Sequence, residues 1–88
     1  MTFEIRVDFY DKYGTIISEV LEITPPDSID EDSMENYLID CANNWFYKTC
    51  RKIFNSIWIG KGGGTYDEYE IEFEDYLEKT KFYIDWED

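Results

Sequence analysis

The first part of the chain alternates apolar and polar residues with the period of a β-strand. Residues 2–10, TFEIRVDFY, place phenylalanine, isoleucine and valine on one side and mostly charged residues on the other, as in a half-buried strand. Residues 11–14, DKYG, predict a turn because glycine readily adopts a positive φ. Residues 15–24 continue as a second strand, which ends at Pro25 and Pro26 because neither can donate to a strand ladder. These segments predict a β-hairpin.

The pattern changes to that of a helix beyond residue 30. Apolar residues recur at spacings of three and four from about residue 31 to residue 54, starting with Met34 and Leu38. Ser28 and Glu31 fit a capping box at the start of this helix. The apolar stripe is wider than one sheet face requires. Its extra width is either buried in a deep core or contacts another molecule.

The remaining chain predicts three more strands, which complete an α+β fold. The expected segments are a strand at 56–60, a glycine connector at 61–64, a strand at 66–75, a turn at 77–80 and a strand at 81–86. A short helix over 72–80 is the alternative for part of this region, because EFEDYLEK contains good helix formers. We therefore expect a single domain, 1–88, in the order β-β-α-β-β-β, with one long helix packed on one face of an antiparallel sheet.

Residues 66–75, YDEYEIEFED, carry an unusual row of acids. If this segment is a strand, alternate glutamates lie about 6.6–6.8 Å apart on one face. Successive phosphates of a nucleic-acid strand are separated by roughly 7 Å, so the row approximates a run of phosphates. Neighbouring strands would extend this face. The expected partner-binding residues are Glu68, Glu70, Glu72, Glu74, Asp67, Asp75, Tyr69, Tyr83, Asp85, Glu4 and Asp8.

The overall charge narrows the class of partner. The chain has 21 acidic and 8 basic residues, no histidine, and a formal net charge of −13. Such a surface is repelled by nucleic acid and by anionic lipid, so we expect neither to bind directly.

Cys41 and Cys50 would lie on opposite sides of one helix, roughly 13 Å apart along its axis, which excludes a bridge between them. With no long apolar run or signal segment, the sequence predicts a cytoplasmic protein.

Catalytic and metal-binding patterns are weak. No histidine is present to act as a base, and a cysteine nucleophile would lack its usual partner. GKGGG at 60–64 lacks the Walker spacing, and DSIDEDSMEN at 27–36 lacks the glycine of a calcium loop. We therefore expect no enzyme activity, no cofactor and no metal.

In size, acidity and lack of catalytic groups, the chain resembles the small acidic proteins with which phages and mobile elements disable host defence. The DNA-mimic anti-restriction and anti-CRISPR proteins belong to that group. This compositional resemblance implies an inhibitor that binds a basic, nucleic-acid-handling protein such as a nuclease or effector complex. For the acid row, the competing explanation is protection of an exposed strand against aggregation.

Two further functions stay open. FYIDWED at 82–88 is similar to the aromatic and acidic C-terminal ends of immunity proteins that neutralise ribonuclease bacteriocins. The resemblance implies an immunity protein for a nuclease toxin. The wide stripe of the long helix favours a third function, a structural or adaptor subunit that oligomerises, for example as a homodimer.

Overall fold

The predicted hairpin is present, but the chain order is β-β-α-α-β. The computed structural model describes the backbone of residues 1–87 and the side chains of residues 1–85. The elements are β1 (Phe3–Tyr10), β2 (Ile16–Ile23), α1 (Glu31–Gly60), α2 (Tyr66–Lys79) and β3 (Lys81–Glu87). The α+β class and the antiparallel sheet are thus confirmed, whereas the predicted order and the single helix are wrong.

The sheet has three strands in the order β2-β1-β3, and both pairings are antiparallel. Ile5, Val7 and Phe9 are fully buried on the face of β1 that was predicted to be apolar. Phe82 and Ile84 of β3 pack on the same side. Trp86 also belongs to the strand predicted at 81–86, and its alternation with Phe82 and Ile84 predicts the same side, but its side chain lies outside the described residues.

Residues 56–60 are not a strand, because α1 continues without a break to Gly60. The aromatic ring of Trp58 lies one turn beyond Phe54 and stacks on it, with 6.0 Å between ring centroids. Helical contacts of this kind override the strand propensity of β-branched and aromatic residues, which depends strongly on context. The helix begins at Glu31, and the N-cap is Asp30, whose side chain accepts from the Ser33 N–H, so the capping box predicted with Ser28 is wrong.

Residues 66–75 are likewise helical, and α2 extends through the predicted turn at 77–80 as far as Lys79. The alternative of a helix over 72–80 was the better interpretation of this part. Phe73 and Tyr76 are buried, and Tyr69 and Leu77 pack against the same cluster. These positions have the helical spacing of three and four residues. Burial of this stripe explains why the segment forms a helix rather than a strand.

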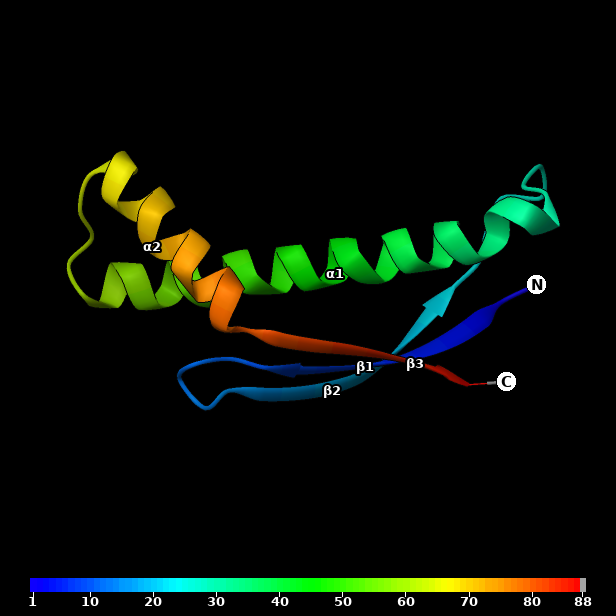
Figure 1. Cartoon of the computed structure of the whole chain (residues 1–88), viewed down its shortest axis with the longest axis horizontal. Helices are drawn as coiled ribbons and strands as arrows, with labels where there is room; N and C mark the ends of the chain where they lie inside the picture. The colour runs from blue at the N-terminus through cyan, green and yellow to red at the C-terminus, as the bar shows by residue number, and fades with distance from the viewer. Residues whose placement is uncertain (88) are drawn as a thin grey trace.

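α1 runs along one face of the sheet, and α2 lies against the second half of α1 at the end of the sheet where the hairpin turns (Figure 1). α1 has 30 residues, which corresponds to about 45 Å, and the longest extent of the molecule is 46 Å. Its first half packs on the strands, where Leu38 and Ala42 contact the Ile5 cluster. Its second half packs with α2, where Cys50 and Phe54 join Phe73 and Tyr76. The wide apolar stripe of α1 therefore has two partners within the molecule.

Candidate protein-binding surface

The start and the end of α2 are fixed by local sequence. Thr65 is the N-cap, and its hydroxyl accepts from the Glu68 N–H at 3.2 Å. Asp67 and Glu68 lie in the first turn and Lys79 in the last, where each charge is favoured by the helix dipole. Gly62 and Gly63 have positive φ values and turn the chain between the helices. Residues 61–64 are thus a connector as predicted, but they join two helices rather than two strands.

The helical conformation of α2 breaks up the predicted row of carboxylates. Residues two apart differ by about 200° around a helix, so Glu68 and Glu72 share one side while Glu70 and Glu74 share another. The strand spacing that suggested a line of phosphates therefore does not apply. Neighbouring strands cannot extend the row either, since α2 lies outside the sheet.

Two of the expected contact residues face Arg51 of α1 instead of solvent. The Arg51 guanidinium donates to the Tyr69 hydroxyl at 3.2 Å and to Glu70 Oε1 at 3.3 Å. It also donates to the Tyr47 hydroxyl at 2.6 Å and lies 4.1 Å from the centroid of the Phe73 ring. The tyrosine hydroxyls, Tyr69 first, raise the pKa of Arg51 above its ordinary value. Arg51 therefore holds α2 against α1, and Tyr69 and Glu70 contribute to that contact.

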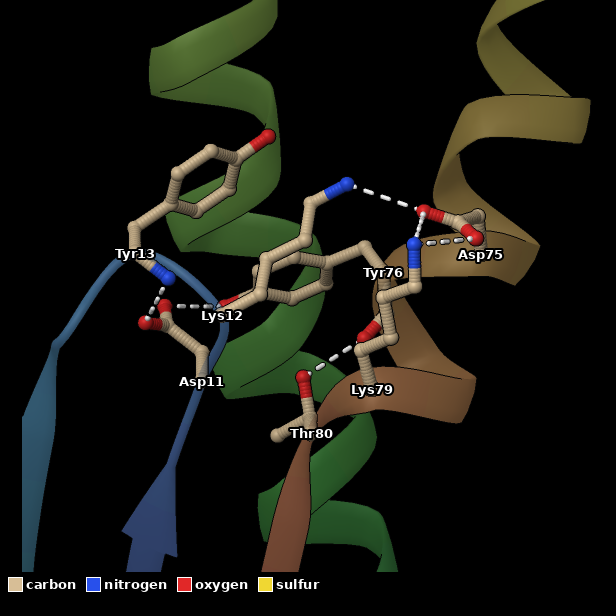
Figure 2. Close-up of polar contacts among 7 residues, drawn as sticks. All are labelled: Asp11, Lys12, Tyr13, Asp75, Tyr76, Lys79 and Thr80. Carbon is tan, nitrogen blue, oxygen red and sulfur yellow. Dashed lines mark hydrogen bonds and ion pairs between the residues drawn. The ribbon is translucent and has the colours of Figure 1, made fainter.

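A third expected contact residue, Asp75, joins α2 to the hairpin turn (Figure 2). Its Oδ2 accepts from Lys12 Nζ at 2.9 Å and from Lys79 Nζ at 3.2 Å. These hydrogen bonds, that of Lys12 first, hold the pKa of Asp75 below its usual value. Asp75 remains half-exposed, with 42% of its side chain accessible, so it is both an anchor and part of the surface.

The same turn is held by a buried tyrosine. Tyr76 is fully buried, and its hydroxyl donates to Asp11 Oδ2 at 2.8 Å. The other oxygen of Asp11 accepts from the N–H groups of Tyr13 and Thr15 at 2.9 and 2.8 Å. Burial, followed by the Asp11 carboxylate, raises the pKa of Tyr76. Both ends of this contact are shown in Figure 2, which places α2 directly beside the β1–β2 turn.

Most of the remaining outward residues of α2 form a surface that we call the α2 acidic face. It consists of Asp67, Glu68, Ile71, Glu72, Glu74, Asp75 and Glu78, with Ile71 between Glu72 and Glu74, which lie at its opposite edges. Tyr66 and Lys79 are exposed as well, and Lys79 lies one turn beyond Asp75, with which it pairs. Ile71 is 69% exposed. Asp67, Glu68, Glu74 and Asp75 occupy the positions three and four residues before and after it, which are its neighbours on a helix surface. An apolar side chain is thus surrounded by four carboxylates.

Ion pairs leave most of this face uncompensated. Among the described side chains, those of α2 that pair with a base are Glu70 and Asp75. Sequence reasoning missed Ile71 and Glu78, because the strand interpretation put Ile71 in the core and Glu78 in a turn. The spacing of Asp67, Ile71, Glu74 and Glu78 at four, three and four residues was the signal that could have found them.

Four expected contact residues lie elsewhere, on the face of the sheet that points away from the helices. Glu4 and Asp8 are on β1, while Tyr83 and Asp85 are on β3, with Asp8 opposite Tyr83. Their placement together on one sheet face is as predicted. They do not join the α2 residues, because the core of the domain separates the outer face of the sheet from α2.

Within the described side chains, those of residues 1–85, no three acids or cysteines are grouped so that they could hold a metal ion. Both cysteines are unbridged, and burial raises the pKa of the Cys50 thiol to about 12, so it stays protonated at neutral pH. In the described part of the chain, no helix is both long and apolar enough to span a membrane.

Comparison of the chain with protein-family models, curated proteins and solved structures found no match.

Proposed function

We propose that the chain is a non-enzymatic inhibitor that binds a basic, nucleic-acid-handling protein through the α2 acidic face. The observation that carries the proposal is the exposed Ile71 surrounded by four carboxylates. Protein interfaces combine an apolar anchor at the centre with a polar rim. Here the rim is acidic, so the complementary surface is an apolar pocket bordered by lysine and arginine.

The charge of the whole chain supports this class of partner. A net charge of −13 attracts a basic protein over a distance and speeds its association. Carboxylates one helical turn apart, such as Glu68 and Glu72, are separated by about 6 Å along the axis. This separation is close to the roughly 7 Å between successive phosphates. We therefore propose that the chain competes with nucleic acid for its partner, with the carboxylates carried by a helix instead of a strand.

The contacts that hold α2 in place also support a binding function. Arg51 holds the inner side of the helix and Tyr76 fixes it to the hairpin turn. A surface that is ordered before binding loses less conformational entropy when the complex forms. The acidic face is thus presented in one orientation.

The proposal is tested by affinity capture from a bacterial lysate treated with nuclease, with elution by increasing salt. We expect a basic nucleic-acid-binding protein that is released at high salt, because screening weakens contacts between charged surfaces. The captured protein is then purified, and its binding to a labelled duplex or RNA is measured by fluorescence anisotropy. The chain should displace the nucleic acid. A captured protein that binds nucleic acid equally well in its presence would refute inhibition by competition.

Two charge-reversal variants separate local chemistry from total charge. Glu72→Lys with Glu74→Lys changes the α2 acidic face, whereas Glu35→Lys with Asp40→Lys changes exposed acids of α1 by the same total charge. The first pair should abolish displacement, and the second should retain most of it. Equal losses in both variants would show that the net charge acts without a defined surface.

The same experiment addresses the two alternatives. Capture of a nuclease toxin, with loss of its activity, would assign the immunity function. The adaptor alternative relied on the wide stripe of α1. Phe54 of that stripe is buried, and Trp45 and Phe46 are partly buried against the core, so the fold gives this alternative less support than the sequence did.

A further inference from the structure

A groove runs between β2 and α1, away from the α2 acidic face. Its volume is about 560 Å³. Ile17 of β2 and Ile53 and Ile57 of α1 supply apolar lining, and Lys52 also lines the groove. A hydrogen bond crosses the groove between α1 and β2, because the Trp45 Nε1–H donates to the Glu19 carboxylate at 3.2 Å. The groove thus has apolar lining and a polar bridge between strand and helix.

The strand beside this groove has an unpaired edge. Within the described residues, β2 has a neighbouring strand on the β1 side alone. The Asp11 N–H donates to the Thr15 carbonyl, so Asp11 and Thr15 form a hydrogen-bonded pair of the ladder. All eight residues of β2 continue this register without a bulge. In such a ladder alternate residues bond to the partner strand, so the N–H groups of Ser18 and Val20 point away from β1.

The protection of this edge against another strand is limited to two acids, Glu19 on the helix side and Glu22 on the opposite side. β2 contains no lysine, arginine or proline, and it is regular over its full length. Edges of this kind are templates for strand addition. A strand added beside β2 would direct every second side chain towards the helix layer. The groove extends along β2 from Thr15 to Glu19, which is about 13 Å and holds two or three such side chains.

We propose that the β2 edge and this groove bind an extended segment of a partner protein that alternates apolar and basic residues. The apolar residues would enter the groove beside Ile17 and Ile57. The basic residues would face the opposite side, where β2 presents Ile16, Ser18, Val20 and Glu22. Glu4 and Asp8 of β1 lie on the same side with Arg6 between them, so on this side the two strands carry three acids and one base. A second copy of the chain is the less favourable occupant, because its β2 would bring its own Glu19 and Glu22 and a further charge of −13.

The test uses a fluorescein-labelled peptide of seven residues in which lysine alternates with isoleucine or valine. Binding to the wild-type chain is measured by fluorescence anisotropy. The control peptide has the same composition with its lysines grouped at one end. We expect the alternating peptide to bind at least about tenfold more tightly, because only it places all its apolar side chains on one face. Equal binding of the two peptides would overturn the proposal and indicate charge attraction alone.

Backbone methylation makes the test specific for strand addition. Two further peptides carry N-methyl groups, one on every lysine and the other on every apolar residue. Successive N–H groups of a strand point in opposite directions, so one of these peptides should lose binding and the other should keep it. The one that loses binding also reveals whether the added strand is parallel or antiparallel. If both bind equally, no ladder forms and the proposal fails.

Protein variants locate the binding site. Ser56→Trp fills the groove from an exposed position of α1 and should abolish peptide binding, with an unchanged circular dichroism spectrum as the folding control. Glu72→Lys with Glu74→Lys should leave it largely intact. If only the Glu72→Lys, Glu74→Lys variant loses peptide binding, the peptide binds the α2 acidic face. That result would overturn this inference without refuting the proposed function. A dimer in analytical ultracentrifugation that Ser56→Trp disrupts would assign the groove to a second copy instead.

Discussion

Neutralising Glu74 should stabilise the protein. Glu74 is exposed on α2, and the acids Glu70 and Glu78 lie one helical turn before and after it. Like charges at this spacing destabilise a helix. If these carboxylates serve binding rather than folding, Glu74→Gln removes repulsion without breaking any described ion pair. The variant therefore tests whether the acidic face reduces the stability of the fold.

The size of the effect follows from the neighbours of Glu74. Each like-charge contact contributes roughly 0.2–0.5 kcal/mol, so two contacts give at most about 1 kcal/mol. Arg51 lies 3.3 Å from Glu70 and offsets part of that repulsion. We therefore expect a gain of about 0.5 kcal/mol, which corresponds to a rise of roughly 2–4 °C in the melting temperature of a domain of this size.

Glu68→Gln is the matched control, because Glu68 lies in the first turn of the same helix. There the helix dipole favours a negative charge by roughly 0.3–1 kcal/mol, which cancels the relief of repulsion from Glu72. Its melting temperature should stay unchanged or fall. Both variants are followed by thermal unfolding at about 10 mM and about 1 M salt, since the Debye length falls to about 3 Å at the higher concentration. A lower melting temperature of Glu74→Gln at low salt would refute the electrostatic explanation, and so would a rise in its melting temperature that persists at high salt.

Three other predictions concern the contacts that hold α2 in place. Tyr76→Phe removes the hydrogen bond to Asp11 and should lower the free energy of unfolding by about 1 kcal/mol in urea titrations; an unchanged value would mean that water replaces the hydroxyl. Gly64→Ala places a Cβ 2.7 Å from the Trp58 ring and should destabilise the fold by about 1 kcal/mol, with a changed near-ultraviolet dichroism spectrum. The pKa of Asp75 is lowered from its ordinary 3.8 by its two lysine partners. The ion pair therefore stabilises the fold above pH 3.8, and this stabilisation is lost as the pH falls through the lower pKa that Asp75 has in the folded state. Asp75→Asn should therefore show a shallower decline in stability below pH 3.8 than the wild type, and parallel curves would contradict this.

The hairpin could be predicted from sequence because one physical rule dominates there. One face of β1 is buried and the other is exposed, so its residues alternate strictly, and Gly14 with a φ of 84° marks the turn. The start of α1 was also placed correctly, since the acids of its first turn and the apolar spacing agree. In both segments the local pattern and the tertiary packing favour the same structure.

α2 was misread because its sequence satisfies two periods at once. Glutamate at every second position imitates a strand, while Tyr69, Phe73 and Tyr76 have helical spacing. The choice depends on α1, which offers an aromatic surface at Phe54 that is known only once the fold is known. The candidate surface changed for the same reason, because rotating Ile71 outward moves the centre of the surface to a residue that a strand would bury.

The position of β1 in the centre of the sheet has a consequence for how the chain reaches its folded state. β2 follows β1 directly, but β3 comes after both helices and pairs with the other edge of β1. Contacts between residues so distant in sequence form slowly, because a long loop must close before any ladder bond is made. During synthesis, that edge of β1 stays open until residues 81–87 have left the ribosome. The interval in which a nascent chain can be captured by another strand therefore lasts until nearly all of the described chain has been made.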